Sequence, residues 1–568
     1  MNKEIEDMLT EKVTTIVSDA ISDLRFWTEL ETKPVLQGSL MYPYPSARIE
    51  IPLQEGYLSR CSLDKLLDRV QVIHEHLCFC MFILNEDSKD YAKNCFNTVI
   101  DIGIDFKLQQ NFREKIFDDS MKDKLFEMPY SSCDLETVLE KFKSDILPYC
   151  SNFGSTKFMG LPDAGNSIAG LSGTILSDFL QQNLINSTFC APIATYMEIA
   201  TIRWLREIVG YQNKKDIKNI WDVGGIITAG GTGSNSTAML LARENHDKTT
   251  MKNGVRNPED YKIILPKGIA HYSIKSSQMW LGMGNNIIEV PTIDYRYDLN
   301  ELEKTLKENK GKVMCVVAYA GDSRGMTVDH FKQIHNVVKS VDENIWLHAD
   351  ACHGFCLGFS DKLKSKISGI ELFDSISTDP HKVLMVPYAI SALLVKNPEK
   401  FGLITTTSDL IMQEDYAFGQ ITPFIGAKAW MSLKLWFVFQ NLGKQGISDI
   451  IEKRCEMANY LKNEIINSKH FVVLNDVDMN SVMFMYVKDK NNIDTEKTNN
   501  LNKKIKAKID SDAMYYLHQF PIADDKGIIE KGKTVFPLRY VSGNDNISKT
   551  DIQNMLNYIN KIGDEINE

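Results

Sequence analysis

The stretch IWDVGGIITAGGTGSNSTAMLLAREN (residues 220–245) runs from apolar residues through a cluster of small ones into a helical pattern. At such a strand-to-helix junction, Gly230, Gly231 and Thr232 expose backbone N–H groups, and the positive end of the following helix adds to them. The turn therefore suits an anionic phosphate group. It is neither a GxGxxG dinucleotide fingerprint nor a P-loop, since no Gly-Lys-Ser/Thr follows. Taken alone, a glycine-rich turn needed only for tight packing is an equally good interpretation.

Short apolar runs continue beyond this turn, separated by segments of helical length. They are YKIILP (261–266), NIIEVPT (286–292), KVMCVVAYAG (312–321), NIWLHADA (344–351), FDSISTDPHK (373–382) and AISALLVKN (389–397). This alternation indicates an α/β fold with a mainly parallel sheet and crossover helices.

The chain divides into three parts. Residues 1–149 are predicted to form a helical N-terminal extension, because apolar residues recur at helical spacing along much of it. Residues 150–405 are predicted to hold the sheet domain, including an N-terminal wrapping segment, 150–195. Residues 406–568 are predicted to hold a mobile loop, a long helix and a small α+β C-terminal domain.

Composition excludes several classes of protein. The 568 residues include 64 Lys+Arg and 75 Asp+Glu, and the net charge of −11 argues against a nucleic-acid binder, whose binding surface is basic. No run of about 18 apolar residues occurs, so no membrane span is expected, and the charged start is unlike a signal peptide. Eleven cysteines without a CxxC pair indicate neither a disulfide scaffold nor a zinc ribbon. We therefore expect a soluble, cytoplasmic protein.

The segment WLHADACHGF (346–355) places Asp350 at the end of an apolar run. A carboxylate at the C-terminal end of a strand points into the usual ligand crevice of an open α/β sheet. It could face a protonated ring nitrogen, have a structural role only, or ligate a metal with Cys352, His353 and Cys356. The metal interpretation is weakened because Asp350 and Cys352 share a strand face, whereas His353 points the opposite way.

The segment SISTDPHKVLMVPYAIS (375–391) places Lys382 between apolar runs. Lys is usually solvated, so this context makes Lys382 a candidate for a lowered pKa and imine chemistry, with a surface lysine as the alternative. A phosphate turn, then Asp350, then Lys382 is the order needed to hold pyridoxal 5′-phosphate. The Lys forms the Schiff base, and the Asp keeps the pyridine nitrogen protonated.

These motifs resemble those of the group II pyridoxal-phosphate-dependent amino-acid decarboxylases, which include the aromatic-L-amino-acid, tyrosine, histidine and glutamate enzymes. The resemblance covers roughly residues 150–565 and implies a fold type I PLP-dependent (aspartate aminotransferase-like) large domain. DPHK is similar to the family's lysine motif, which makes Lys382 the Schiff-base residue and His381 a cofactor neighbour. HADAC resembles the family's His-Val-Asp-Ala-Ala, so Asp350 becomes the pyridine partner and Cys352 lies against the ring, where the family usually has Ala.

Further motifs extend the resemblance. AHYSIKSSQMWLGMG is similar to the family's Ala-His-Tyr-Ser stretch and implies that His271 stacks on the cofactor. AGGTGSN resembles the family's phosphate turn and contains Gly230, Gly231 and Thr232. EDYAFGQITPFIG resembles the mobile loop whose Tyr protonates the product carbon, which implies that role for Tyr416.

The resemblance implies decarboxylation of an L-amino acid by a homodimer, with a segment near 185–190 supplied by the partner chain. Trp280, Tyr416 and Phe418 favour an aromatic substrate. Asp163, at the expected edge of the pocket, could favour a cationic or hydroxyl-bearing substrate, or cap a turn. Two alternatives are a PLP-dependent carbon–carbon lyase of the sphingosine-phosphate lyase type, which DACHGF resembles, and a non-catalytic PLP-fold binding protein. DPHK and the Tyr416 loop favour the decarboxylase.

Overall fold

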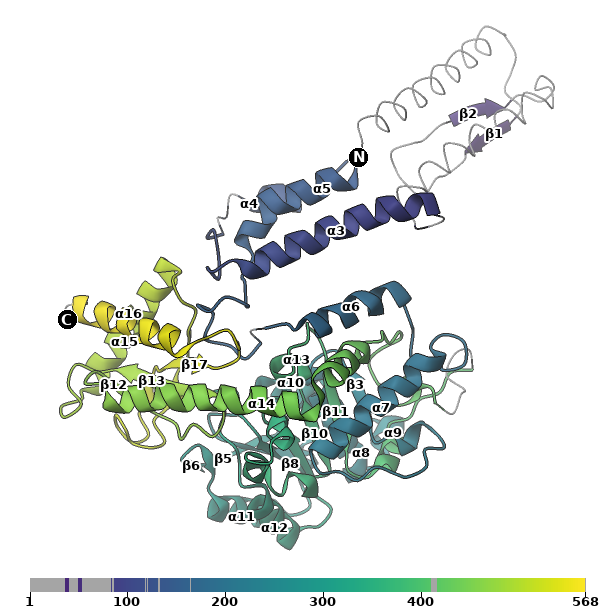
Figure 1. Ribbon diagram of the computed structural model, residues 1–568. Helices are drawn as coiled ribbons and strands as arrows, with labels where there is room; N and C mark the ends of the chain where they lie inside the picture. Colours follow the sequence, from purple (N-terminus) through teal and green to yellow (C-terminus); the bar gives the residue numbers. More distant parts are fainter. Residues whose placement is uncertain are drawn as a thin grey trace. The chain divides into compact units, whose positions relative to one another are not determined.

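The computed structural model describes residues 36–39, 50–53, 83, 86–117, 119, 121–130, 133–163, 165–409 and 416–566 (Figure 1). The chain forms two compact units, one of residues 1–107 with 113–150 and the other of residues 108–112 with 151–568.

The first unit contains helices and a short hairpin. Its elements are β1 (Leu36–Ser39), β2 (Glu50–Leu53), α3 (Glu86–Leu108), α4 (Met121–Phe126) and α5 (Leu135–Lys141). β1 and β2 pair antiparallel, and the side chain of Asp134 caps α5 by accepting a hydrogen bond from the Thr137 N–H. These helices lie within the segment for which a helical extension was predicted, whereas the hairpin was not predicted.

A seven-stranded sheet forms the centre of the second unit. In spatial order its strands are β3 (Gly225–Thr228), β11 (Ser391–Val395), β10 (Ser375–Thr378), β9 (Trp346–Asp350), β8 (Val313–Tyr319), β4 (Lys262–Pro266) and β5 (Ile287–Val290). β11 runs antiparallel to both of its neighbours, and all other pairs are parallel. The predicted α/β fold with a mainly parallel sheet is therefore confirmed.

Helices cover this sheet, and its central strands are therefore buried along their whole length. Every residue of β3, β8, β9, β10 and β11 is buried. The helices are α6 (Ile168–Leu180), α7 (Pro192–Ile208), α8 (Gly231–His246), α9 (Thr250–Asn253), α10 (Tyr272–Trp280), α11 (Leu299–Glu308), α12 (Phe331–Val341) and α13 (Pro380–Val383). α8 packs across β3 and β8–β11 and contacts α10. A short ribbon of β6 (Thr292–Ile293) and β7 (Arg296–Tyr297) precedes α11.

A smaller α+β domain follows the long helix α14 (Ser432–Asn467), which packs on α6 and α7 and reaches β12 and β13 (Figure 1). The antiparallel sheet has the order β12 (Phe471–Val473), β13 (Ser481–Tyr486), β17 (Leu538–Val541) and β14 (His518–Gln519). β15 (Ile522–Ala523) pairs with β16 (Thr534–Val535), and helices α15 (Thr495–Asp512) and α16 (Lys549–Glu565) complete the domain. Its apolar core is separate from that of the large sheet.

Candidate active site

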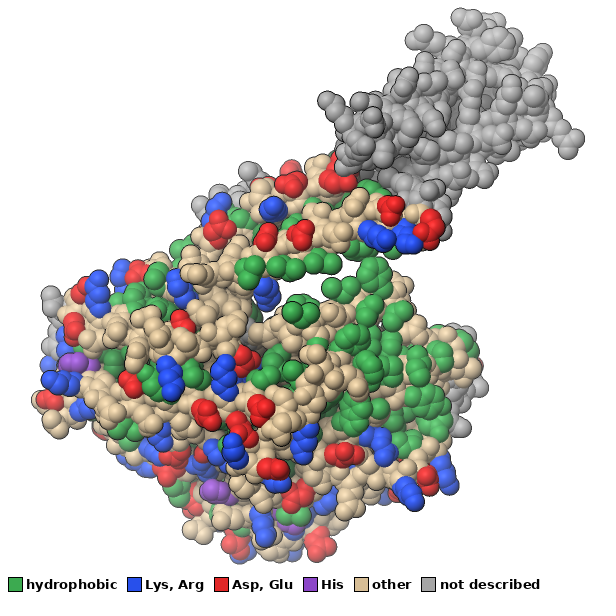
Figure 2. All heavy atoms as spheres, viewed as in Figure 1, with side chains coloured by type: hydrophobic (Ala, Val, Ile, Leu, Met, Phe, Trp, Pro, Cys, Tyr) green, Lys and Arg blue, Asp and Glu red, His purple; other side chains and the backbone are tan. Residues whose placement is uncertain are grey.

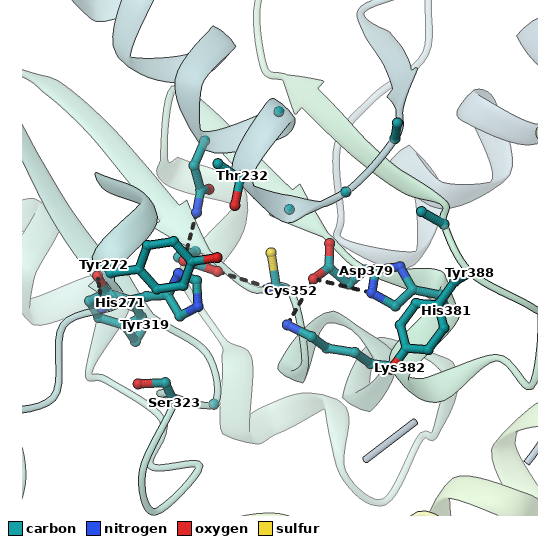
Figure 3. Close-up of a pocket in the computed structure, with 18 residues that line it drawn as sticks. Thr232, His271, Tyr272, Tyr319, Ser323, Cys352, Asp379, His381, Lys382 and Tyr388 are labelled. Atoms are coloured by element: carbon teal, nitrogen blue, oxygen red, sulfur yellow. Dashed lines mark hydrogen bonds and ion pairs between the residues drawn. The ribbon is translucent and has the colours of Figure 1, made fainter. Parts of the chain in front are cut away.

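A cavity of about 420 Å³ opens where the strands of the large sheet end (Figure 3). Its lining comes from the turns that follow β3, β4, β8, β9 and β10, the position at which open α/β sheets bind ligands. The lining residues are Ala229, Gly230, Gly231, Thr232, Gly233, Asn235, His271, Tyr272, Tyr319, Gly321, Ser323, Asp350, Cys352, Asp379, His381, Lys382, Tyr388 and Ala389. The structure thus brings together all the sequence-predicted cofactor residues.

The glycine turn after β3 needs its small residues. Gly230 has φ 148°, a conformation that side chains other than glycine rarely adopt. A Cβ on Gly231 would lie 2.8 Å from both carboxylate oxygens of Asp379 and from the Sγ of Cys352. Gly231 is also the first residue of the 16-residue helix α8. The turn therefore presents backbone N–H groups and a helix N-terminus to the cavity, as a phosphate group requires.

Lys382 pairs with Asp379, three residues before it. Its Nζ lies 2.8 Å from Asp379 Oδ2, and the Ser391 hydroxyl donates a hydrogen bond to the same carboxylate. Burial lowers the pKa of Lys382, but the nearby negative charges, led by Asp379, outweigh burial and raise it. The lowered pKa expected from the sequence is therefore wrong for this structure, because the apolar neighbours in sequence are less important than this ion pair.

Asp350 ends β9, and N–H donors face both of its carboxylate oxygens. The Nδ2 of Asn235 donates to Oδ2 at 2.9 Å, and the backbone N–H of Cys352 donates to Oδ1 at 3.3 Å. Asp350 is 5% exposed and lines the cavity, so its carboxylate is available to a protonated ring nitrogen.

His271 follows β4 and caps α10. Its Nδ1 accepts a hydrogen bond from the backbone N–H of Ser273, and the backbone N–H of His271 donates to the Tyr319 hydroxyl. Burial is the main cause that lowers the pKa of His271, so the ring is neutral at neutral pH. Its ring lies on the cavity beside Tyr272, with the ring centroids 4.4 Å apart.

Asp163 and Tyr416 are not among the residues that line this cavity. Asp163 lies near Lys382 and Tyr388, and burial raises the pKa of its carboxyl. The Oδ1 atom of Asp163 is buried without a hydrogen-bond partner. The Tyr416 hydroxyl donates to the Ile217 carbonyl at 3.0 Å. The preceding residue of the same loop, Asp415, lies outside the described residues.

Other residues named from the sequence are placed elsewhere. Trp280 is exposed and Phe418 is fully buried, and neither lines the cavity. His353 Nε2 bonds to the Asn480 Oδ1 at 2.8 Å. Within the described ranges, no group of three or more His, Cys, Asp or Glu side chains is arranged to hold a metal. Ile185 is buried in its own chain, whereas Phe189 is exposed.

Sequence reasoning missed several cavity residues, among them Asn235, Tyr319, Ser323 and Tyr388. Asn235 carried a signal, since it is a polar residue on the first turns of the helix after the phosphate turn. Tyr388 carried none, because it lies in an irregular loop.

The small domain also contacts a loop that lines the cavity. Arg539 of β17 donates hydrogen bonds to the carbonyl oxygens of Ser323 (2.7 Å) and Gly160 (3.1 Å). Ser323 lines the cavity. A side chain from the C-terminal domain therefore holds one of the loops that form the site.

A glycine cradle, a strand-end carboxylate, a cavity lysine and an imidazole fit pyridoxal 5′-phosphate, and they define the class of fold type I PLP-dependent enzymes. A family model described as "Pyridoxal-dependent decarboxylase conserved domain" matches residues 119–487. The chain therefore belongs to the pyridoxal-dependent decarboxylase family. It is a carboxy-lyase of amino-acid metabolism, and its cofactor is pyridoxal 5′-phosphate.

Individual relatives agree with this assignment. The aromatic-L-amino-acid decarboxylase of Bacillus atrophaeus is 24% identical over 408 residues, which are 69% of this chain and 80% of the relative. The L-2,4-diaminobutyrate decarboxylase of Acinetobacter baumannii is 27% identical over 321 residues, 52% of this chain and 61% of the relative. A crystal structure of Oryza sativa TDC with PLP and tryptamine superposes with a TM-score of 0.75 at 18% identity, covering 85% of this chain and 99% of that chain.

Proposed function

We propose that this enzyme decarboxylates an L-amino acid with an aromatic side chain to the corresponding amine and CO2, and that it acts as a homodimer. The cofactor-dependent reaction is supported most directly by the convergence of Lys382, Asp350, His271 and the glycine turn on one cavity.

Each of these groups has a part in holding the cofactor. When bound, pyridoxal 5′-phosphate supplies a ring that accepts the electron pair left when CO2 departs. Lys382 would bind it covalently through Nζ, and Gly230, Gly231 and Thr232 would hold its phosphate. Asp350 would keep the ring nitrogen protonated, which favours charge delocalisation. His271 would cover the ring, and Cys352 and His381 would contact it.

The carbon that loses CO2 must then gain a proton from a positioned acid. Tyr416 is our candidate, because a phenol donates a proton and returns to its neutral state. Its hydroxyl is bonded to Ile217 in this structure, so delivery requires the loop to move. Closure of the loop would also exclude water and oxygen from the cavity.

Two exposed tyrosines at the cavity support an aromatic substrate. Tyr272 and Tyr388 both line the cavity and are more than half exposed. Such rings offer stacking surfaces to another aromatic group.

Asp163 supports a second candidate, a substrate whose side chain carries a cationic or hydroxyl donor. The Asp163 carboxyl lies near Lys382, and its buried Oδ1 atom has no hydrogen-bond partner. The relative from Acinetobacter baumannii is named for L-2,4-diaminobutyrate. The test is a panel of L-amino acids with detection of both amine and CO2. Turnover of phenylalanine and tyrosine supports the aromatic proposal, whereas turnover restricted to diaminobutyrate overturns it in favour of the second candidate.

An exposed apolar face on the second unit supports the homodimer. Figure 2 shows hydrophobic side chains gathered over α6 and α7. These exposed residues are Ile168, Leu171, Ile175, Leu176, Phe179, Phe189 and Ile193. Contiguous apolar surface of this kind typically marks an interaction site. Light scattering at assay concentration should give twice the chain mass of 64.6 kDa, and fully active monomers would refute the proposal.

We place the enzyme in the cytoplasm. The eight cysteines within the described ranges are all free thiols, as in a reducing compartment. The helices described also include none long and apolar enough to cross a membrane.

A further inference from the structure

A chain of buried hydrogen bonds lies behind the cavity and centres on Asn235. This residue is 1% exposed and stands on the first turns of α8. Its Nδ2 donates to Asp350 Oδ2 at 2.9 Å and to Ser273 Oγ at 2.8 Å. An ionised carboxylate only accepts hydrogen bonds, so the amide nitrogen must face Asp350 and the amide oxygen must face away from it.

The amide oxygen of Asn235 faces His348, which is fully buried. The Nε2 of His348 lies 3.0 Å from Asn235 Oδ1. Because that oxygen only accepts, Nε2 carries the ring proton. The Nδ1 atom then accepts from the Ser375 hydroxyl at 2.8 Å, and Ser375 Oγ accepts from Trp346 Nε1 at 2.8 Å. The Ser377 Oγ also lies 3.4 Å from His348 Nε2 and accepts there, because Nε2 carries the proton. The directions of the hydrogen bonds from Asn235 through His348 to Ser375 are therefore determined.

A second branch leads from Asn235 to His271. Ser273 Oγ accepts from Asn235 and lies 2.7 Å from His271 Nδ1. The backbone N–H of Ser273, which can only donate, also points at Nδ1 at 3.3 Å. Nδ1 is therefore an acceptor, and the proton of the neutral His271 ring is on Nε2.

We propose that Asn235 is a positioning residue that couples Asp350 to His271 through this chain. It orients the Asp350 carboxylate toward the ring nitrogen and, through Ser273, fixes the His271 ring with its proton on Nε2. The inference rests on the proposed role of Asp350. It has a chemical consequence, because a neutral imidazole that is protonated on Nε2 donates a hydrogen bond but is a poor acid. The proton for the product carbon must then come from another group, such as Tyr416.

The first test compares two cofactors on the apoenzyme. Pyridoxal 5′-phosphate and its 1-deaza analogue, in which C–H replaces the ring nitrogen, are titrated by fluorescence. Asn235→Leu keeps a similar volume and removes all polar atoms. Ser236→Ala is the matched control, since the Ser236 and Ser277 hydroxyls bond at 2.8 Å between the same two helices, α8 and α10.

We expect Asn235→Leu to weaken binding of pyridoxal 5′-phosphate roughly tenfold, the usual effect of losing a hydrogen bond to a charged group. Binding of the deaza analogue should change less than about threefold, because Asp350 has no ring nitrogen to contact there. Ser236→Ala should leave the ratio of the two affinities as in the wild type. Equal weakening of both cofactors by Asn235→Leu would overturn the proposal, since a purely structural residue would act in this way.

The wild-type enzyme separates failure of this inference from failure of the proposed site. A wild type that binds both cofactors equally would refute the role of Asp350 itself. If Asn235→Leu fails to fold, His348→Gln and His348→Leu replace it. Gln keeps an N–H for Asn235 and should bind like the wild type, whereas Leu should reproduce the selective loss. Equal behaviour of these two variants would overturn the proposal.

The second test measures the His271 tautomer directly. Histidine ¹⁵N spectra of the apoenzyme at pH 7.5 should show His271 protonated on Nε2, with His271→Gln to identify its signal. A proton on Nδ1 would overturn the branch through Ser273.

Discussion

Replacing Tyr416 by Phe removes one hydroxyl and keeps the ring. The structure limits what that hydroxyl contributes as a purely structural group. It donates a hydrogen bond to the Ile217 carbonyl at 3.0 Å, and one such bond is worth about 1 kcal/mol net and at most about 1.5 kcal/mol. Loss of that bond alone would therefore change the rate by roughly tenfold at most.

A general acid contributes more than this. Its removal typically costs on the order of 10²-fold or more in rate. We therefore expect Tyr416→Phe to lower amine formation at least about 100-fold, while cofactor binding and its absorbance persist. With no proton delivered, oxygen should oxidise the decarboxylated product, so aldehyde and ammonia should appear in place of amine.

The assay measures amine, aldehyde, CO2 and oxygen uptake in parallel. Tyr196→Phe is the matched control, because its ring packs 5.5 Å from that of Tyr416 and also loses only a hydroxyl. A Tyr416→Phe enzyme that forms amine within tenfold of the wild-type rate, without aldehyde, would refute the assignment. Mixed dimers of Tyr416→Phe and Lys382→Ala chains also tell which subunit's cavity Tyr416 serves, since only action across the interface restores activity.

Three further predictions concern named groups. Lys382→Ala should abolish activity and borohydride trapping of the cofactor while the protein stays folded, and a trapped cofactor on the variant would contradict the assignment. Burial lowers the pKa of His348 to about 4 and that of His353 to about 3, whereas unfolded His titrates near 6.5. Between about pH 6.5 and 4 the unfolded chain therefore binds protons that the folded chain excludes, so stability should fall with decreasing pH. Melting curves from pH 7 to 5 should show this fall, with a smaller slope for His353→Gln. Lys428 and Glu198 form a fully buried ion pair at 2.7 Å, so Lys428→Met should cost about 3–5 kcal/mol in urea unfolding. Adding Glu198→Gln should recover most of that loss, and no recovery would argue against the charge as its cause.

The sequence was most informative where a residue with recognisable chemistry directly follows a predicted strand. The apolar runs predicted a mainly parallel sheet, because strands that are covered on both faces tend to form near-continuous apolar runs. Asp350 and Lys382 could be placed at the same edge of that sheet because each follows such a run. The antiparallel insertion of β11 could not be predicted, since a buried strand has the same composition in either direction.

The wrong predictions concern side-chain contacts that the order of residues along the chain does not reveal. Lys382 was expected to have a lowered pKa from its apolar neighbours, yet Asp379 sits against its Nζ. Trp280 and Phe418 were chosen as substrate aromatics from proximity in sequence, whereas Tyr272 and Tyr388 reach the cavity. The side chain that holds the Ser323 loop comes from more than 200 residues further along the chain.

That side chain, Arg539, connects the small C-terminal domain to the catalytic site in the large domain. All the residues assigned to the cofactor precede residue 405, and Tyr416 follows shortly after it, so a fragment that ends just before β17 would keep every reactive group named above. It would nevertheless lack the guanidinium that fixes the Ser323 and Gly160 carbonyls. The two domains thus have separate hydrophobic cores, yet we expect a truncation between Tyr416 and β17 to impair the catalytic centre without removing one of its reactive groups.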